Sequence, residues 1–78
     1  MEIKVLGTGC AKCDLLEDST KKAVDKAGID ATVEKVTDMR EIMAYGVMTT
    51  PALVVDGQVR VAGRVPSVDD LVSLLTRT

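Results

Sequence analysis

Residues 6–13 read Leu-Gly-Thr-Gly-Cys-Ala-Lys-Cys and join a short apolar run to a helical pattern. The apolar run over residues 3–6 stops at two glycines, and two cysteines separated by two residues follow directly. This order predicts a strand, a tight loop, a dithiol and a helix. Because Cys10 and Cys13 are the only cysteines of the chain, the loop is the first place to look for chemistry.

The spacing of the two cysteines suits thiol chemistry at a helix start. Positions i and i+3 share one helix face, so the two thiols can close a small disulfide. Unpaired N–H groups and the positive end of the helix dipole lower the pKa of a cysteine there. Lys12 acts in the same sense and Asp14 against it. We therefore predict an exposed nucleophile at Cys10, a more buried resolving thiol at Cys13 and electrostatic tuning by Lys12.

Two other interpretations of the cysteine pair stay open on the motif alone. Two cysteines can be small buried side chains without reactivity, and C-x-x-C is also half of many zinc sites. The chain has no His and only two Cys, so one copy cannot supply four Cys/His ligands to zinc. We therefore predict no metal site within a single chain.

Length and composition indicate one domain over residues 1–78, and we expect a monomer. The formal net charge is −2 and Tyr45 is the single aromatic residue, so a nucleic-acid-binding surface is not expected. No apolar run is long enough to span a membrane, and residues 1–4 show no signal-peptide pattern. We expect a reducing cytoplasmic location, where a C-x-x-C pair is catalytic or metal-binding more often than structural.

Apolar periodicity predicts seven elements along the chain. They are a strand over 2–6, a helix over 11–27, a strand over 29–36, a short helix ended by Gly46, strands over 52–55 and 58–62, and a closing helix from Val68. The strand–helix–strand start implies a right-handed crossover and a parallel pair. Asp56-Gly57 is a two-residue hairpin signal, so the last two strands should be antiparallel.

Helical spacing also predicts which side chains form the core. Leu15 and Leu16 start an apolar stripe on the 11–27 helix. Met39, Ile42 and Met43 form an apolar stripe on the short helix. For the methionines at 39, 43 and 48 we predict core packing in preference to a soft-metal site.

Residues 45–57, Tyr-Gly-Val-Met-Thr-Thr-Pro-Ala-Leu-Val-Val-Asp-Gly, resemble a characteristic segment of the thioredoxin superfamily. In that family the proline is cis and faces the active-site disulfide. The resemblance implies that Pro51 is cis and that the backbone of Thr50 binds an extended substrate peptide. Residues 63–71 are similar to the segment before the last helix of thioredoxins and glutaredoxins.

The resemblance covers nearly the whole chain and is nearest to short "redox-active disulfide" proteins that begin G-T-G-C-x-x-C. It implies a minimal thioredoxin/glutaredoxin-like α/β fold, β-α-β-α-β-β-α, with a four-stranded mixed sheet flanked by three helices. The chain departs from the family at several positions. The family's Trp before the first cysteine is absent, Ala-Lys replaces Gly-Pro between the cysteines, and Lys4 stands where the family has a buried acid.

These observations predict a thiol–disulfide oxidoreductase. The Cys10 thiolate would attack a substrate disulfide, and Cys13 would then attack the Cys10 sulfur and release the reduced substrate. The redox group would be the Cys10–Cys13 disulfide, with no other cofactor. The partners would be a disulfide-containing protein and an electron donor, either a reductase or a small thiol.

Alternative functions use the same two thiols. Two thiolates suit Cu(I), so a soft-metal carrier is one alternative. Heavy-metal-associated domains also place C-x-x-C after a first strand, but they end in a strand, whereas this chain is predicted to end in a helix. A dimer that shares four thiolates around zinc is another. A third is a docking module whose thiols regulate partner binding, because one sheet face should carry only the middle helix.

Overall fold

Four strands form one mixed sheet in the order β2-β1-β3-β4. The computed structural model describes residues 1–9, 11–47 and 49–76. In it the central strand β1 runs parallel to β2 and antiparallel to β3, and β3 runs antiparallel to β4. The strand bounds are β1 (Glu2–Leu6), β2 (Thr32–Val36), β3 (Ala52–Val55) and β4 (Gln58–Ala62).

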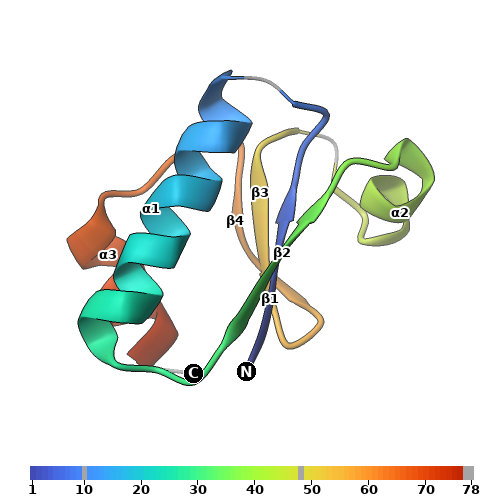
Figure 1. Ribbon diagram of the computed structural model, residues 1–78. Coiled ribbons are helices and arrows are strands. Elements are labelled where there is room, and N and C mark those ends of the chain that lie inside the picture. Colours follow the sequence, from blue (N-terminus) through green and yellow to red (C-terminus); the bar gives the residue numbers. More distant parts are fainter. Residues whose placement is uncertain (10, 48, 77–78) are drawn as a thin grey trace.

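Three helices cover the two faces of the sheet unequally. α1 (Ala11–Ala27) and α3 (Val68–Thr76) pack side by side on one face, and the short α2 (Met39–Ala44) lies on the other (Figure 1). The element order is β-α-β-α-β-β-α, which confirms the predicted fold class. None of the helices in the described part of the chain is both long and apolar enough to cross a bilayer.

Strand alternation divides the core into two clusters, because successive side chains point to opposite faces of a sheet. The two-helix face, covered by α1 and α3, holds the larger cluster. Its buried members are Ile3, Val5, Leu16, Ala23, Leu53, Val55, Val61, Leu71 and Leu75. The α2 face holds the smaller cluster, made of Leu6, Val36, Ile42, Ala52 and Val54. One hydrophobic core therefore dominates the fold, and the α2 face is only partly sealed.

Local signals in the sequence set the turn and the caps. Asp56 and Gly57 have φ values of 49° and 83°, the two left-handed residues that a type I′ hairpin turn requires. Asp38 caps α2 by accepting a hydrogen bond of 2.8 Å from the Arg40 N–H. Ser67 caps α3 in the same way, with its hydroxyl 3.1 Å from the nitrogen of Asp70. The turn confirms the predicted hairpin, and the two side-chain caps fix where α2 and α3 begin.

The second strand is shorter than predicted. It begins at Thr32, three residues after the predicted start at Ile29. β1 begins at Glu2, which pairs with Thr32, so the residues before Thr32 have no neighbouring strand to pair with. Gly28, with φ of 65°, ends α1, and the Ile29 N–H bonds back to Val24. Ile29 instead packs against the edge of the core from the connection.

The prediction that Leu15, Met39 and Met43 are core residues was wrong. Their exposed fractions are 54%, 57% and 68%. On α1 the buried stripe is narrow and passes through Leu16, one helical step of about 100° away from Leu15. On α2 a helix of six residues turns only Ile42 onto the sheet as a buried side chain.

Candidate functional site

The loop that carries the dithiol meets the proline segment at one end of the sheet. Leu6, the last residue of β1, pairs with Ala52, the first residue of β3. Gly7 and Pro51 are the next residues outward and therefore lie at the same end. The Gly7 N–H also donates a hydrogen bond of 3.0 Å to the carbonyl of Val36 at the end of β2. Three strand ends thus converge beside the start of α1.

Cys13 is fully buried in the first turn of α1, as predicted for a resolving thiol. Its side chain lies directly against Gly7. A Cβ built on Gly7 would fall only 2.7 Å from the Cys13 Cβ and would also overlap the Cys13 sulfur. Glycine is therefore required at position 7 by the close approach of the cysteine.

Cys13 is disulfide-bonded in the structure. The predicted nucleophile, Cys10, lies outside the described residues, so its role stays a prediction. Met48, which the sequence places just before the proline segment, also lies outside them.

The Thr50–Pro51 peptide bond is cis, as the resemblance implied. Pro51 is fully buried, and its carbonyl accepts a hydrogen bond of 2.8 Å from the Gly63 N–H. Gly63 in turn lies against Thr49, because a Cβ at position 63 would be only 3.1 Å from the Thr49 hydroxyl oxygen. Thr50 is exposed, so the residue predicted to receive a substrate peptide is accessible. The loop after β4 therefore holds the proline segment in place through the Gly63–Pro51 hydrogen bond and the close approach of Gly63 to Thr49.

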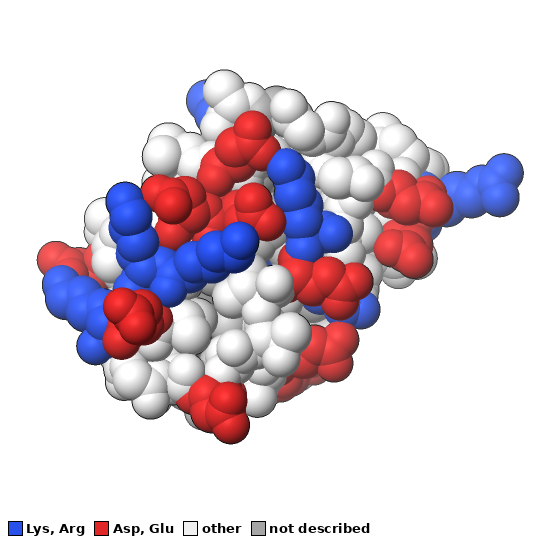
Figure 2. Space-filling model, in the orientation of Figure 1, with Lys and Arg blue, Asp and Glu red and all other residues white. Residues whose placement is uncertain are grey.

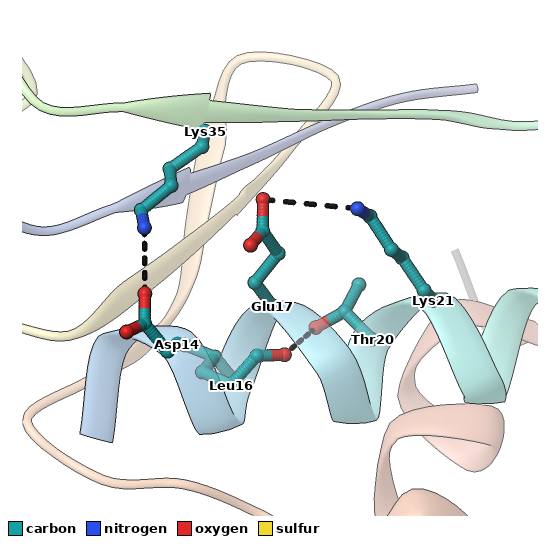
Figure 3. Close-up of polar contacts among 6 residues, drawn as sticks. All are labelled: Asp14, Leu16, Glu17, Thr20, Lys21 and Lys35. Atoms are coloured by element: carbon teal, nitrogen blue, oxygen red, sulfur yellow. Dashed lines mark hydrogen bonds and ion pairs between the residues drawn. The ribbon is translucent and has the colours of Figure 1, made fainter. Parts of the chain in front are cut away.

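Charges around the first turn of α1 partly cancel. Lys12 is exposed there, as its predicted tuning role requires. Asp14, which opposes Lys12, is held by Lys35 of β2 with an N–O distance of 2.6 Å (Figure 3). The hydrogen bond that the Lys35 ammonium donates to Asp14 raises the pKa of Lys35, and the nearby Glu17 charge adds to this.

Lys35 is a site residue that the sequence reasoning missed. It pairs in register with Val5, so its side chain projects onto the two-helix face and reaches α1. The alternation of Val33 and Lys35 along the strand was the signal that could have found it.

Lys4 occupies the position of the family's buried acid, on the opposite face of β1 from α1. Its ammonium lies 3.3 Å from the Tyr45 hydroxyl and 3.4 Å from a Glu2 carboxylate oxygen. The Tyr45 contact is the main cause that raises the pKa of Lys4, and Glu2 contributes in the same direction. These groups border a cleft of about 350 Å³ that extends to the Asp56–Gly57 turn, away from the dithiol end.

The arrangement at the dithiol end suits sulfur exchange with an extended substrate. A buried cysteine, a helix start and an exposed residue before a cis proline lie at one end of the sheet. Within residues 1–9, 11–47 and 49–76, no three Cys, Asp or Glu side chains gather as metal ligands.

Comparisons with known proteins agree with this geometry. A family model described as a thioredoxin domain matches residues 1–76. A protein named thioredoxin from Methanothermobacter thermautotrophicus is 41% identical over 76 residues, which cover 97% of this chain and 99% of that protein. A second thioredoxin, from Methanocaldococcus jannaschii, is 42% identical over 69 residues, covering 88% of this chain and 79% of that protein.

Proposed function

The chain belongs to the thioredoxin superfamily, a family of thiol–disulfide oxidoreductases, and from this premise we propose that it reduces protein disulfides with Cys10 and Cys13. The family membership covers almost the full chain. Within that family we assign Cys10 as the nucleophile and Cys13 as the resolving thiol, with electrons passing from the dithiol to the substrate.

The reaction has two exchange steps. The Cys10 thiolate attacks one sulfur of a substrate disulfide, forms a mixed disulfide and releases the other substrate sulfur as a thiolate. The Cys13 thiolate then attacks the Cys10 sulfur, which closes the Cys10–Cys13 disulfide and releases the second substrate thiolate. Two electrons pass from the protein dithiol to the substrate. A reductase or a small thiol would restore the dithiol.

One observation carries the proposal: Cys13 is buried against Gly7 at the same end of the sheet as the cis Thr50–Pro51 bond. A buried second sulfur is shielded from outside disulfides, so it suits attack within the mixed disulfide. An exposed Thr50 offers its backbone to a substrate strand, and Lys12 adds positive charge near the attacking sulfur. The same proposal places the reaction in a reducing cytoplasm, where such a pair cycles.

Trapping the mixed disulfide tests the two roles. The Cys13→Ser variant should accumulate a covalent adduct with a disulfide-containing protein, because no resolving thiol remains. The Cys10→Ser variant should form little adduct, since its only remaining thiol, that of Cys13, is buried. Mass spectrometry of the intact adducts measures both. Equal trapping by the two variants would contradict the assignment of nucleophile and resolving thiol.

The alkylation rate of each cysteine against pH is the companion measurement. Cys10 should react with a pKa below the ordinary thiol value of about 8.5, and Cys13 should react slowly at every pH. Two ordinary thiols would remove the mechanism, and metal titration of the pair would then test the soft-metal carrier.

A further inference from the structure

A groove of about 450 Å³ lies between β4 and the outer side of α3. Pro66 and Leu74 contribute apolar surface, and Ser73 contributes a hydroxyl. The charged side chains that line it are Arg60, Arg64 and Asp70. None of these residues has a role in the proposed exchange reaction.

A β-bulge sets the place of Arg60 in this groove. Leu53 pairs with Val61, but its neighbour Val54 pairs with Val59, so Arg60 is the extra residue of β4. Without the bulge, the side chains of β4 would alternate regularly. The insertion turns Arg60 toward the α3 side while Val61 still reaches the core. Bulges commonly re-aim a side chain in this way near functional sites.

Arg64 links the groove to the dithiol end of the sheet. It follows Gly63, whose N–H donates a hydrogen bond to the Pro51 carbonyl and where a Cβ would lie 3.1 Å from the Thr49 hydroxyl oxygen. Arg64 therefore lies at the end of the groove that is nearer to the exposed residues Thr49 and Thr50, and Arg60 lies farther along β4. A substrate strand that lies on Thr50 would bring its neighbouring side chains near Arg64.

The two arginines are not neutralised by neighbours in the described part of the chain. The ion pairs there all use lysine: Lys4, Lys21, Lys22, Lys26 and Lys35. Asp70 also faces the groove, but it lies beyond ion-pair distance of both guanidinium groups. The groove therefore carries a net charge of +1 on a chain whose net charge is −2.

We propose that Arg60 and Arg64 form a carboxylate-binding subsite for the disulfide substrate, selecting substrates with an acidic side chain near the reactive sulfur. Guanidinium groups bind carboxylates through paired, charge-assisted hydrogen bonds. The subsite rests on the proposed function and adds substrate preference to it. The exchange chemistry is unchanged, because the dithiol still supplies both electrons.

Two short peptide disulfides provide the test. They are equal in length and sequence except that glutamate flanks the cysteine in one and glutamine in the other. The pre-reduced protein should reduce the glutamate peptide about threefold to tenfold faster at low salt. That advantage should shrink at high ionic strength, because salt screens exposed charges beyond about 10 Å at 0.1 M.

Charge-removing variants locate the effect. Arg60→Gln and Arg64→Gln should each lower the rate with the glutamate peptide by about threefold and leave the glutamine peptide unaffected. Asp70→Asn should raise the rate with the glutamate peptide. Arg40→Gln is the matched control, because it removes the same charge from exposed α2 on the other face of the sheet. Retention of the preference in the Arg60/Arg64 double variant would overturn the subsite.

The glutamine peptide separates the two proposals. If the protein reduces neither peptide, the oxidoreductase function fails. If it reduces both at equal rates, the oxidoreductase function stands and the carboxylate subsite fails. Circular dichroism of each variant checks that the fold is retained, and both arginines are exposed, so large losses of stability are not expected.

Discussion

The two faces of the sheet differ in how completely they are covered. On the two-helix face, α1 and α3 bury nine side chains, among them Leu16, Leu53 and Leu71. On the α2 face, a helix of six residues covers a cluster of five, beside the partly exposed Lys4 and Glu2. Figure 2 shows acidic and basic side chains interspersed over the face of the molecule that is turned to the viewer.

The face of the sheet under α1 and α3 therefore contributes more to stability than the face under α2. A domain of this size has little stability to spare. More of the described buried apolar side chains lie under α1 and α3 than under α2, and α1 also carries Cys13. The cysteine is thus anchored to the stronger core. The α2 face has lower packing demands, and it tolerates the exposed Met39 and Met43.

The largest expected effect comes from truncating each cluster in turn. Leu71→Ala should destabilise the protein by about 2–5 kcal/mol, because Leu71 is fully buried between α3 and the sheet. Ile42→Ala on the α2 face should cost less, at the lower end of about 2–5 kcal/mol, because the thin covering layer can collapse onto the gap. Urea unfolding measures both.

Two further variants serve as controls for the comparison between Leu71→Ala and Ile42→Ala. Met43→Ala should change stability by less than about 0.5 kcal/mol, since Met43 is 68% exposed. Leu71→Val gives a smaller cavity if Leu71→Ala does not fold. A larger loss for Ile42→Ala than for Leu71→Ala would reverse the ranking of the two faces.

Gly7→Ala tests the contact between the dithiol helix and the sheet end. The new methyl group would overlap Cys13, so the expected cost is about 1–3 kcal/mol of overpacking. The rate of disulfide reduction, measured on folded protein, should fall as well, because the start of α1 must shift.

Gly46→Ala is the matched control on the α2 side. Gly46 has φ of 75° and open space around it, so alanine there brings only a left-handed backbone penalty of about 1–2 kcal/mol. Its exchange rate should stay at the wild-type value. If both variants lose stability and only Gly7→Ala loses rate, the contact with Cys13 is the cause.

The ion pair between Asp14 and Lys35 should tune the dithiol from the two-helix face. Lys35→Gln exposes the Asp14 charge to the helix start and should raise the pKa of Cys10 by about half a unit. Asp14→Asn should lower it by a similar amount, and the double variant should lie near wild type. Alkylation against pH measures each value.

Lys4→Gln tests whether a lysine on the other face of the sheet also affects the pKa of Cys10. Lys4 projects from β1 toward Tyr45 and away from α1. Lys4→Gln should shift the Cys10 pKa less than Lys35→Gln does. An equal or larger shift would mean that the lysine at the family's acid position governs the nucleophile.

The smallest expected effect concerns the pair between Lys26 of α1 and Asp69 of α3. The hydrogen bond from Lys26 lowers the pKa of Asp69 below its usual value. Because the folded-state pKa of Asp69 is lowered, its ionised carboxylate stabilises the folded protein, fully so above the unfolded pKa of about 3.9. This stabilisation is lost as the pH falls through the folded-state pKa. Asp69→Asn should therefore lower the urea midpoint slightly at pH 7, and progressively less as the pH falls below the unfolded pKa of about 3.9.

Asp18→Asn serves as its control, because Asp18 pairs with Lys22 within α1 and joins no two elements. Its effect on the urea midpoint at pH 7 should be smaller. High salt should reduce both effects, since the pairs are exposed.

Much of the fold was predictable because its signals are local. The turn at Asp56-Gly57 and the caps at Asp38 and Ser67 depend on residues within a few positions of each other. The cis bond before Pro51 came from the resemblance of a continuous segment. Even the burial of Cys13 followed from its place one turn into a helix.

The amino-acid sequence therefore predicts the order and type of the elements, the place of the cysteine pair at a helix start, and the family. The contacts made across the sheet could be learned only from the folded molecule. These are the approach of Cys13 to Gly7, the pairing of Lys35 with Asp14, and the bulge that turns Arg60 toward α3. Each depends on strand register and helix placement, which arise from packing between segments far apart in the chain.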